Sequence, residues 1–234
     1  MSYRLLLVIL ACFSATWGQD LPFKVGETLI YTTGFRLFSA GTSTMEIVKQ
    51  DEDSVLHIVS QVRTGDFFDH LYRIRDRIDL WLDSRTLELR HMLRDIYEGG
   101  YERRDTTYVD REAGLIYARR DTLTVAEPVF DPIGAIYYFR TLPLAIDDEV
   151  HLAIFDGRRL RKIAITVSGV ELIKVPAGEF ECLVLKPTPL DNKRLTSADG
   201  ILHLWLTDDQ RRIPVRIEQK ASFGTIVLKL AEVK

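Results

Sequence analysis

The stretch Arg73-Ile74-Arg75-Asp76-Arg77-Ile78-Asp79-Leu80-Trp81-Leu82 alternates between charged and apolar side chains, and this alternation decides the fold class. Successive side chains of an extended backbone point to opposite sides, so the stretch predicts a β-strand with one solvent-exposed face and one buried face. The solvent-exposed face carries Arg73, Arg75, Arg77 and Asp79. Asp76 points with the apolar residues, which places it near a strand end or beside a partner inside the protein.

Similar alternating segments fill most of the chain after residue 27. They predict strands over 28–33, 56–62, 74–82, 87–93, 115–117, 160–167, 172–175, 180–185, 201–206, 213–217 and 225–230. Short turn sequences separate several of them and are typical of hairpins: Asp156-Gly157, Pro176-Ala177-Gly178 and Asp208-Asp209-Gln210. We therefore expect an all-β fold with one or two short helices, in which a curved antiparallel sheet forms a half-barrel or barrel. Residues 19–234 are expected to make a single domain.

Helix signals are few. Asp131 and Pro132 predict a helix start, because Asp caps the free backbone N–H groups and Pro fits the first helical position. Pro143 is expected to end that helix. A second short helix is expected over 67–72, with Asp66 as its cap and Phe67, Phe68 and Leu71 as its apolar side.

The first 18 residues have the layout of a secretory signal peptide. Arg4 precedes the apolar run 5–13, and small and polar residues follow up to Gly18. The run is too short for a membrane-spanning helix, which needs about 20 apolar residues. We expect cleavage before Gln19, a mature form without a transmembrane segment, and a periplasmic location. In the alternative interpretation residues 9–12 are a lipobox, and the mature protein is a lipoprotein anchored through Cys12.

The charge and cysteine content of the chain limit which molecules it can bind and which covalent links it can form. The chain has 31 basic and 34 acidic residues and a formal net charge of −3, which is unsuited to nucleic acid. Loss of the signal peptide leaves Cys182 as the single cysteine, so no internal disulfide can form. Cys182 lies in phase with Phe180 and Val184, which predicts a buried packing residue rather than a nucleophile.

The alternating stretch also suggests an anion site. Arg73, Arg75 and Arg77 on one face offer three guanidinium groups that suit a phosphate or carboxylate. The alternative is a solvated outer face on which these arginines pair with acids of neighbouring strands.

The sequence lacks local motifs of common enzymes. The five histidines are scattered, and there is no His-Glu-x-x-His helix, Gly-x-Ser-x-Gly turn or glycine-rich phosphate loop. We expect no catalytic residue, no metal and no cofactor. The alternative is a carboxylate-dependent hydrolase, whose acid and base would come from Asp76, Asp79, Asp208 or Asp209.

Aromatic residues suggest what the curved sheet holds. Such a sheet, closed by a short aromatic helix, can enclose an apolar cavity for one ligand. The residues expected to contact this ligand are Tyr31, Phe67, Phe68, Asp76, Tyr137, Tyr138 and Trp205. We therefore interpret the chain as a non-enzymatic envelope protein that binds a lipid or another amphiphile. The alternative is an envelope assembly module with a filled core, whose protein partner docks on a strand edge such as the one bearing Pro214.

Several blocks of the sequence resemble those of a known protein family. They are Val25-Gly26-Glu27-x-Leu29-x-Tyr31, Ala40-Gly41, Asp131-Pro132 with Tyr137-Tyr138-Phe139-Arg140, Val175-Pro176-Ala177-Gly178-x-Phe180-x-Cys182, and Leu204-Trp205-Leu206-x-Asp208-Asp209 with Arg212-Ile213-Pro214-Val215. With these blocks in this order, the chain resembles the bacterial family known as domain of unknown function 3108. The resemblance implies an exported protein of a Gram-negative envelope and brings no established reaction or catalytic residue. The fold it implies is similar to that of the half-barrel lipoprotein carriers of the periplasm.

Overall fold

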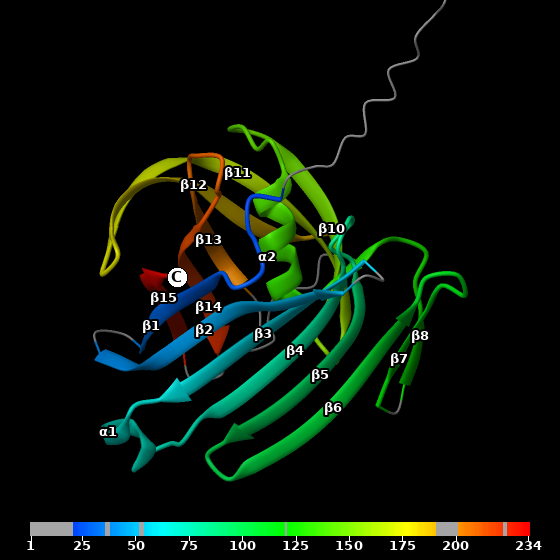
Figure 1. Cartoon of the computed structure of the whole chain (residues 1–234), viewed down its shortest axis with the longest axis horizontal. Helices are drawn as coiled ribbons and strands as arrows, with labels where there is room; N and C mark the ends of the chain where they lie inside the picture. Colours follow the sequence, from blue (N-terminus) through cyan, green and yellow to red (C-terminus); the bar gives the residue numbers. More distant parts are fainter. Residues whose placement is uncertain (1–20, 36–37, 52–53, 120, 191–200, 222–223) are drawn as a thin grey trace, which may run out of the picture.

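A single curved sheet makes up most of the protein (Figure 1). The computed structural model describes residues 21–35, 38–51, 54–119, 121–190, 201–221 and 224–234, and within these it has fifteen strands and two helices. The strands are β1 (Thr28–Phe35), β2 (Phe38–Asp51), β3 (Val55–Thr64), β4 (Arg75–Asp83), β5 (Leu89–Glu98), β6 (Tyr101–Asp110), β7 (Leu115–Ala118), β8 (Asp121–Thr124), β9 (Val129–Phe130), β10 (Glu149–Phe155), β11 (Leu160–Val175), β12 (Gly178–Pro189), β13 (Ile201–Thr207), β14 (Pro214–Ala221) and β15 (Gly224–Val233). The helices are α1 (Asp66–Asp69) and α2 (Pro132–Thr141).

The strand order shows that the sheet is open. It runs β8-β7-β6-β5-β4-β3-β2-β1-β15-β14-β13-β12-β11-β10-β9. Neighbours are antiparallel, apart from the short parallel pair β9 and β10. The first and last strands lie side by side in the middle, where Leu29 pairs with Val233 and Phe35 with Ile226. The expected curved antiparallel sheet is confirmed, in its half-barrel form rather than as a closed barrel.

Every predicted strand overlaps an observed one, but no strand was predicted at β2, β6, β8, β9 or β10, and two local features were misread. Residues 160–167 and 172–175 belong to one strand, β11, whose register shifts between Val167 and Val170. This β-bulge breaks the alternation and therefore looks like a strand end in the sequence. Pro214 begins β14, but β14 is paired on both sides, with β13 and β15. The expected docking edge at Pro214 is therefore wrong, because β14 is an inner strand of the sheet.

Helix α2 lies inside the curve of the sheet (Figure 1). As predicted, Asp131 caps it: the carboxylate accepts hydrogen bonds from the backbone N–H of Ile133 (2.8 Å) and of Gly134 (3.1 Å), and Pro132 is the first helical residue. Gly134 allows this cap, since a Cβ there would lie 2.6 Å from Asp131 Oδ2. The helix ends at Thr141, two residues before Pro143.

Helix α1 is shorter than predicted and its cap was predicted wrongly. The N-cap is Gly65, and Asp66 is already helical. The chain leaves the helix after one turn, at Asp69, because it must soon enter β4. Two of the three residues of the expected apolar side are not buried either, since Phe67 is 73% exposed and Leu71 is 72% exposed. In the described part of the chain, neither helix has the length and apolar content needed to span a membrane.

The packed core lies between α2 and the concave face of the sheet. Its largest fully buried side chains are Arg140, Tyr31, Tyr137, Phe155, Leu29, Ile47, Leu56, Ile58, Leu80, Leu82, Leu87 and Leu89. This core fills only part of the curve, and a cavity lies beside it.

Candidate functional site

A cavity of about 390 Å³ lies on the concave side of the sheet, next to the start of α2. Strands β1 to β5 line one wall, β14 and β15 another, and the first turn of α2 contributes the residues between them. The apolar side chains lining it are Met45, Val62, Phe68, Ile74, Ile78, Met92, Ile96, Ile133, Ile136, Ile217, Ile226 and Leu228. A mainly apolar pocket of roughly 300 to 1,000 Å³ with a few polar groups is the usual form of a small-molecule site.

Small residues on β1 and β2 create this space. Thr33, Gly34, Ala40, Gly41 and Ser43 all line the cavity. At Gly41 no side chain fits, because a Cβ would lie 2.1 Å from the backbone oxygen of the facing strand. Gly41 thus permits the close approach of β2 and β3, while the small side chains of the other four residues occupy little of the space beside them.

Asp76 on β4 and Glu98 at the end of β5 form a hydrogen-bonded carboxyl pair in the cavity. Asp76 Oδ1 also accepts a hydrogen bond from the backbone N–H of Tyr97 (3.0 Å). Burial, and then the negative charge of Glu98, raise the pKa of Asp76 to about 7. The pair therefore retains a proton close to neutral pH and can exchange that proton for a hydrogen bond from a ligand.

Two further charged groups border the cavity where α2 begins. Asp131 is almost completely buried, and burial raises its pKa to about 6. Arg94 Nη1 donates to the backbone oxygen of Asp156 (2.5 Å), and Arg94 Nε has no hydrogen-bond partner in the described structure. The carboxylate of Asp156 is used within its own turn, where Oδ1 accepts from the backbone N–H of residues 158 and 159.

Two hydroxyl groups on the cavity wall are buried without a partner. Thr33 is 8% exposed and Ser43 is 1% exposed, and neither Oγ has a hydrogen-bond partner among the described residues. A buried hydroxyl that forms no hydrogen bond costs about 1 to 3 kcal/mol. A ligand with a polar group at this place would remove that cost.

Phe68 and Asp76 are the predicted contact residues that line the cavity. Phe67, on the same turn as Phe68, is instead directed to the surface and is largely exposed. The alternation of β4 explains Asp76, since Asp76 shares the concave side with Ile74 and Ile78, which line the same cavity.

The other four predicted aromatic residues lie in the core or at its border, outside the lining of the cavity. Tyr31 is fully buried and donates a hydrogen bond to a backbone oxygen on β14 (2.9 Å). Tyr137 is fully buried on α2, and Tyr138 packs on Phe130 at a centroid distance of 4.7 Å. Trp205 Nε1 donates to a carboxylate on β11 (2.9 Å). A role of these four in ligand binding stays a prediction.

The predicted anion patch lies on the outer face of β4 and the turn before it. Arg75 pairs with Asp69, Arg77 Nε lies 2.7 Å from Asp79 Oδ2, and Arg73 Nε lies 3.8 Å from Asp69 Oδ2. All three arginines are thus engaged by acids. The solvated-face interpretation expected such pairing, but the acids belong to α1 and to β4 itself rather than to neighbouring strands.

The four candidate acids of the hydrolase alternative are not brought together. Asp76 faces the cavity, whereas Asp79 lies on the other face of β4 and binds Arg77. Asp209 Oδ1 organises the turn between β13 and β14: it accepts from Thr207 Oγ1 (2.7 Å) and from the backbone N–H of residues 211 and 212. Asp208 pairs with a side chain of that same turn.

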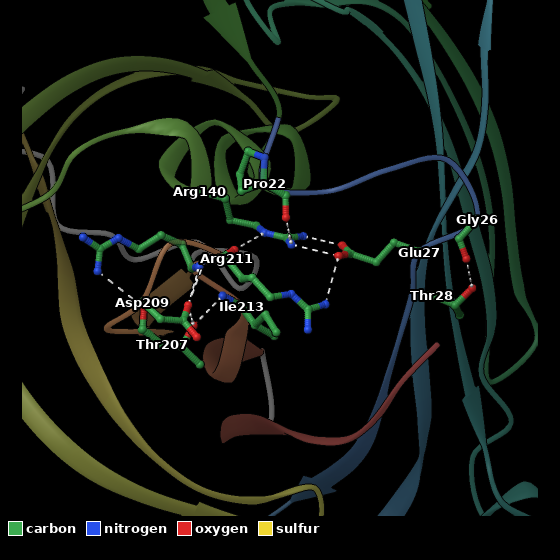
Figure 2. Close-up of polar contacts among 10 residues, drawn as sticks. Pro22, Gly26, Glu27, Thr28, Arg140, Thr207, Asp209, Arg211 and Ile213 are labelled. Atoms are coloured by element: carbon green, nitrogen blue, oxygen red, sulfur yellow. Dashed lines mark hydrogen bonds and ion pairs between the residues drawn. The ribbon is translucent and has the colours of Figure 1, made fainter. Parts of the chain in front are cut away.

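A buried ion pair fixes the other end of the interior (Figure 2). Arg140 of α2 donates to Glu27, with Nη1 at 2.5 Å from Oε1 and Nη2 at 3.0 Å from Oε2. Arg140 also donates to the backbone oxygens of Pro22 (3.4 Å) and Arg211 (3.2 Å), and its guanidinium lies 5.0 Å from the ring centroid of Phe23. One side chain thus joins the segment before β1, α2 and the turn before β14.

A family model described as "Protein of unknown function (DUF3108)" matches residues 23–231. The chain belongs to this family. A search of curated proteins found no match.

Two solved structures align with this DUF3108 chain at low sequence identity. A β-barrel-like protein of the family DUF1849 from Brucella abortus is 10% identical with a TM-score of 0.60, and the alignment covers 90% of this chain and 97% of that one. A DUF1089 family protein from Pseudomonas aeruginosa is 13% identical with a TM-score of 0.45, over 77% of this chain and 90% of that one. The first of these likenesses shows a shared barrel-like fold.

Parts of three of the blocks that carry the family resemblance, residues 25–31, 131–140 and 212–215, meet near Arg140. Glu27 and Arg140 form the ion pair, and the Tyr31 hydroxyl reaches the backbone oxygen of Pro214. The polar groups of the cavity come largely from elsewhere in the DUF3108 chain. Glu98 and Arg94 were missed in the sequence, although both lie in phase with Met92 and Ile96 and so could have been assigned to the concave face.

Other reactive groups are few in the described residues. They contain no cluster of three or more His, Cys, Asp or Glu side chains that could hold a metal. Cys182 is fully buried, as predicted, and burial raises its pKa to about 12, which keeps the thiol protonated.

Proposed function

We propose that this protein binds an apolar or amphiphilic ligand, such as a lipid, in the cavity of its curved sheet. The observation that carries the proposal is the cavity itself, which is mainly apolar and large enough for part of an acyl chain. It lies beside a core that is already well packed, so the fold does not depend on closing it. A second support is the Asp76 and Glu98 pair, which offers hydrogen-bonding carboxyl groups in an otherwise mainly apolar lining and so suits a ligand with a polar end.

We further propose that the protein works in the periplasm after export. The support is the sequence of residues 1–18, which lie outside the described residues. Mass spectrometry of the protein purified from cells tests this: a mature form beginning at Gln19 is expected, and incorporation of palmitate at Cys12 would favour the lipoprotein alternative. A chain that keeps its first residues and stays in the cytosol would contradict the proposal.

Ligand binding is tested by native mass spectrometry and by displacement of a fluorescent fatty-acyl probe. Val62 lines the cavity, so Val62→Trp is expected to fill it and abolish binding. The matched control is Val48→Trp, because Val48 lies on β2 with 42% of its surface exposed. If the unmodified protein takes up no acyl probe and carries no ligand from the cell, the proposed function is wrong.

A carboxylate-dependent hydrolase is the second candidate, and the Asp76 and Glu98 pair is the observation that favours it. Two carboxyls that share a proton can act as general acid and base. A panel of chromogenic esters and glycosides tests this candidate. Turnover that disappears in Asp76→Asn would support it, and equal rates in both proteins would exclude it.

A further inference from the structure

We infer that the ligand of the cavity is an amphiphile with a primary ammonium headgroup, bound by the carboxyls of Asp76 and Glu98. This inference rests on the proposed function and specifies the chemistry of its ligand. The hydrocarbon part of the ligand occupies the apolar wall, and the ammonium donates hydrogen bonds to the carboxyl pair.

The charge balance of the cavity favours a cation. Four acids line it, Asp76, Glu98, Asp131 and Asp156, against two bases, Arg63 and Arg94. Asp131 is committed to capping α2 and Asp156 to its turn. In the described structure no basic side chain is hydrogen-bonded to Asp76 or Glu98, so this pair has acceptor oxygens available for a ligand.

The unpartnered hydroxyls independently indicate a polar ligand. Thr33 Oγ1 and Ser43 Oγ are more than nine-tenths buried on the cavity wall and lack hydrogen-bond partners in the described residues. Ser43 pairs with Val62, and Val62 pairs with Asp76, so Ser43 and Asp76 lie in one cross-strand row. Two strand spacings separate them by about 10 Å. The row therefore places hydrogen-bonding groups on both sides of one ligand position in an otherwise apolar wall.

Binding of the ammonium is linked to a proton. The carboxyl pair holds one proton near neutral pH, and an ammonium that donates to both carboxylates takes the place of that proton, which leaves for solvent. The ammonium keeps its own charge, so the net reaction is ligand bound and one proton released. The other ionisable groups that line the cavity are Tyr72 before β4, Arg94 on β5, Arg63 on β3, Asp131 before α2 and Asp156 after β10. The charge of Arg94 lowers the pKa of Asp76, whereas Arg63 Nη2 donates to Gln61 Oε1 (3.4 Å).

Three probes of equal chain length test the headgroup: decylammonium, decanol and decanoate, each titrated into the full protein by isothermal titration calorimetry. We expect decylammonium to bind about tenfold more tightly than decanol at pH 7.5, because hydrogen bonds to charged groups are stronger than neutral ones. In Asp76→Asn this preference is expected to disappear while decanol still binds. The control Asp95→Asn, on the exposed outer face of β5, is expected to keep it.

The pH dependence gives a second readout. Below pH 7 the affinity for decylammonium should fall by about tenfold per pH unit, whereas the affinity for decanol should stay constant. If decanol binds as tightly as decylammonium, or decanoate binds most tightly, the ammonium inference is wrong and the proposed function stands. If none of the three binds, the proposed function itself is wrong.

Discussion

Removal of one partner of the Glu27 and Arg140 ion pair should destabilise the protein strongly. The Arg140 side chain is 0% exposed and that of Glu27 is 5% exposed, so Glu27→Gln would leave a positive charge buried with only neutral acceptors. Uncompensated charges of this kind cost about 3 to 5 kcal/mol, and we expect Glu27→Gln to fall near the lower end because the amide keeps one hydrogen bond. Arg140→Met should cost a similar amount, since it also removes the hydrogen bonds to the backbone oxygens of Pro22 and Arg211.

The double variant separates the ion pair from other effects. In the combination of Glu27→Gln with Arg140→Met no charge remains buried, so the cost should be well below the sum of the two single variants. Arg211→Met is the matched control: Arg211 lies 3.7 Å from Glu27 but is 55% exposed, and its loss should cost less than about 1 kcal/mol. Urea unfolding followed by tryptophan fluorescence measures all four variants. A cost for Glu27→Gln no larger than that for Arg211→Met would refute the reasoning.

Three further predictions concern single side chains. Because the pKa of Asp76 is raised to about 7 in the folded protein, the folded state binds the proton more tightly than the unfolded state, and stability should fall as pH rises from 4 through 7. Asp76→Asn should therefore be more stable than the parent protein by about 1 to 2 kcal/mol at pH 8, and by much less at pH 4. Urea titrations of both proteins at the two pH values measure this difference. An equal difference in stability at both pH values would contradict the prediction. Asp131→Ala should lower the free energy of unfolding by about 1 to 2 kcal/mol through loss of the cap of α2, whereas Asp131→Asn keeps an acceptor and should change it little. Cys182, whose pKa is raised to about 12 by burial, should react with a thiol reagent only after urea unfolding, and rapid labelling of the native protein would show that the burial is wrong.

Local patterns in the sequence were sufficient to predict ten of the fifteen strands and the main helix, whereas β2, β6, β8, β9 and β10 were not predicted. The predicted strands were recognised by the alternation of their own residues, and the start of α2 by the neighbouring residues Asp131 and Pro132. Two other failures are local exceptions to these patterns. The bulge in β11 interrupts the alternation without ending the strand, and the one-turn helix α1 leaves Phe67 and Leu71 exposed although they are large and apolar.

The site was less predictable because its members meet only in three dimensions. Asp76 was recognised because its own strand makes it an exception, but its partner Glu98 comes from the end of the next strand. Glu27 and Arg140 are 113 residues apart, and nothing in either neighbourhood indicates that they pair. The aromatic residues pointed to a cavity but not to its position, since Tyr31 and Tyr137 are buried in the packed core beside it.

The pairing of β1 with β15 has a consequence for the order in which the sheet assembles. β15 follows all the other strands in the sequence but lies in the centre of the sheet, between β1 and β14. Until β15 has paired, β1 is an edge strand whose free backbone groups can pair with another chain. In a nascent polypeptide lacking residues 224–234, the hydrogen-bonded ladder would be interrupted in the middle of the sheet rather than shortened at its edge. Assembly of the sheet therefore has to wait for contacts between distant parts of the chain, which slows folding and prolongs the exposure of the unpaired edge of β1.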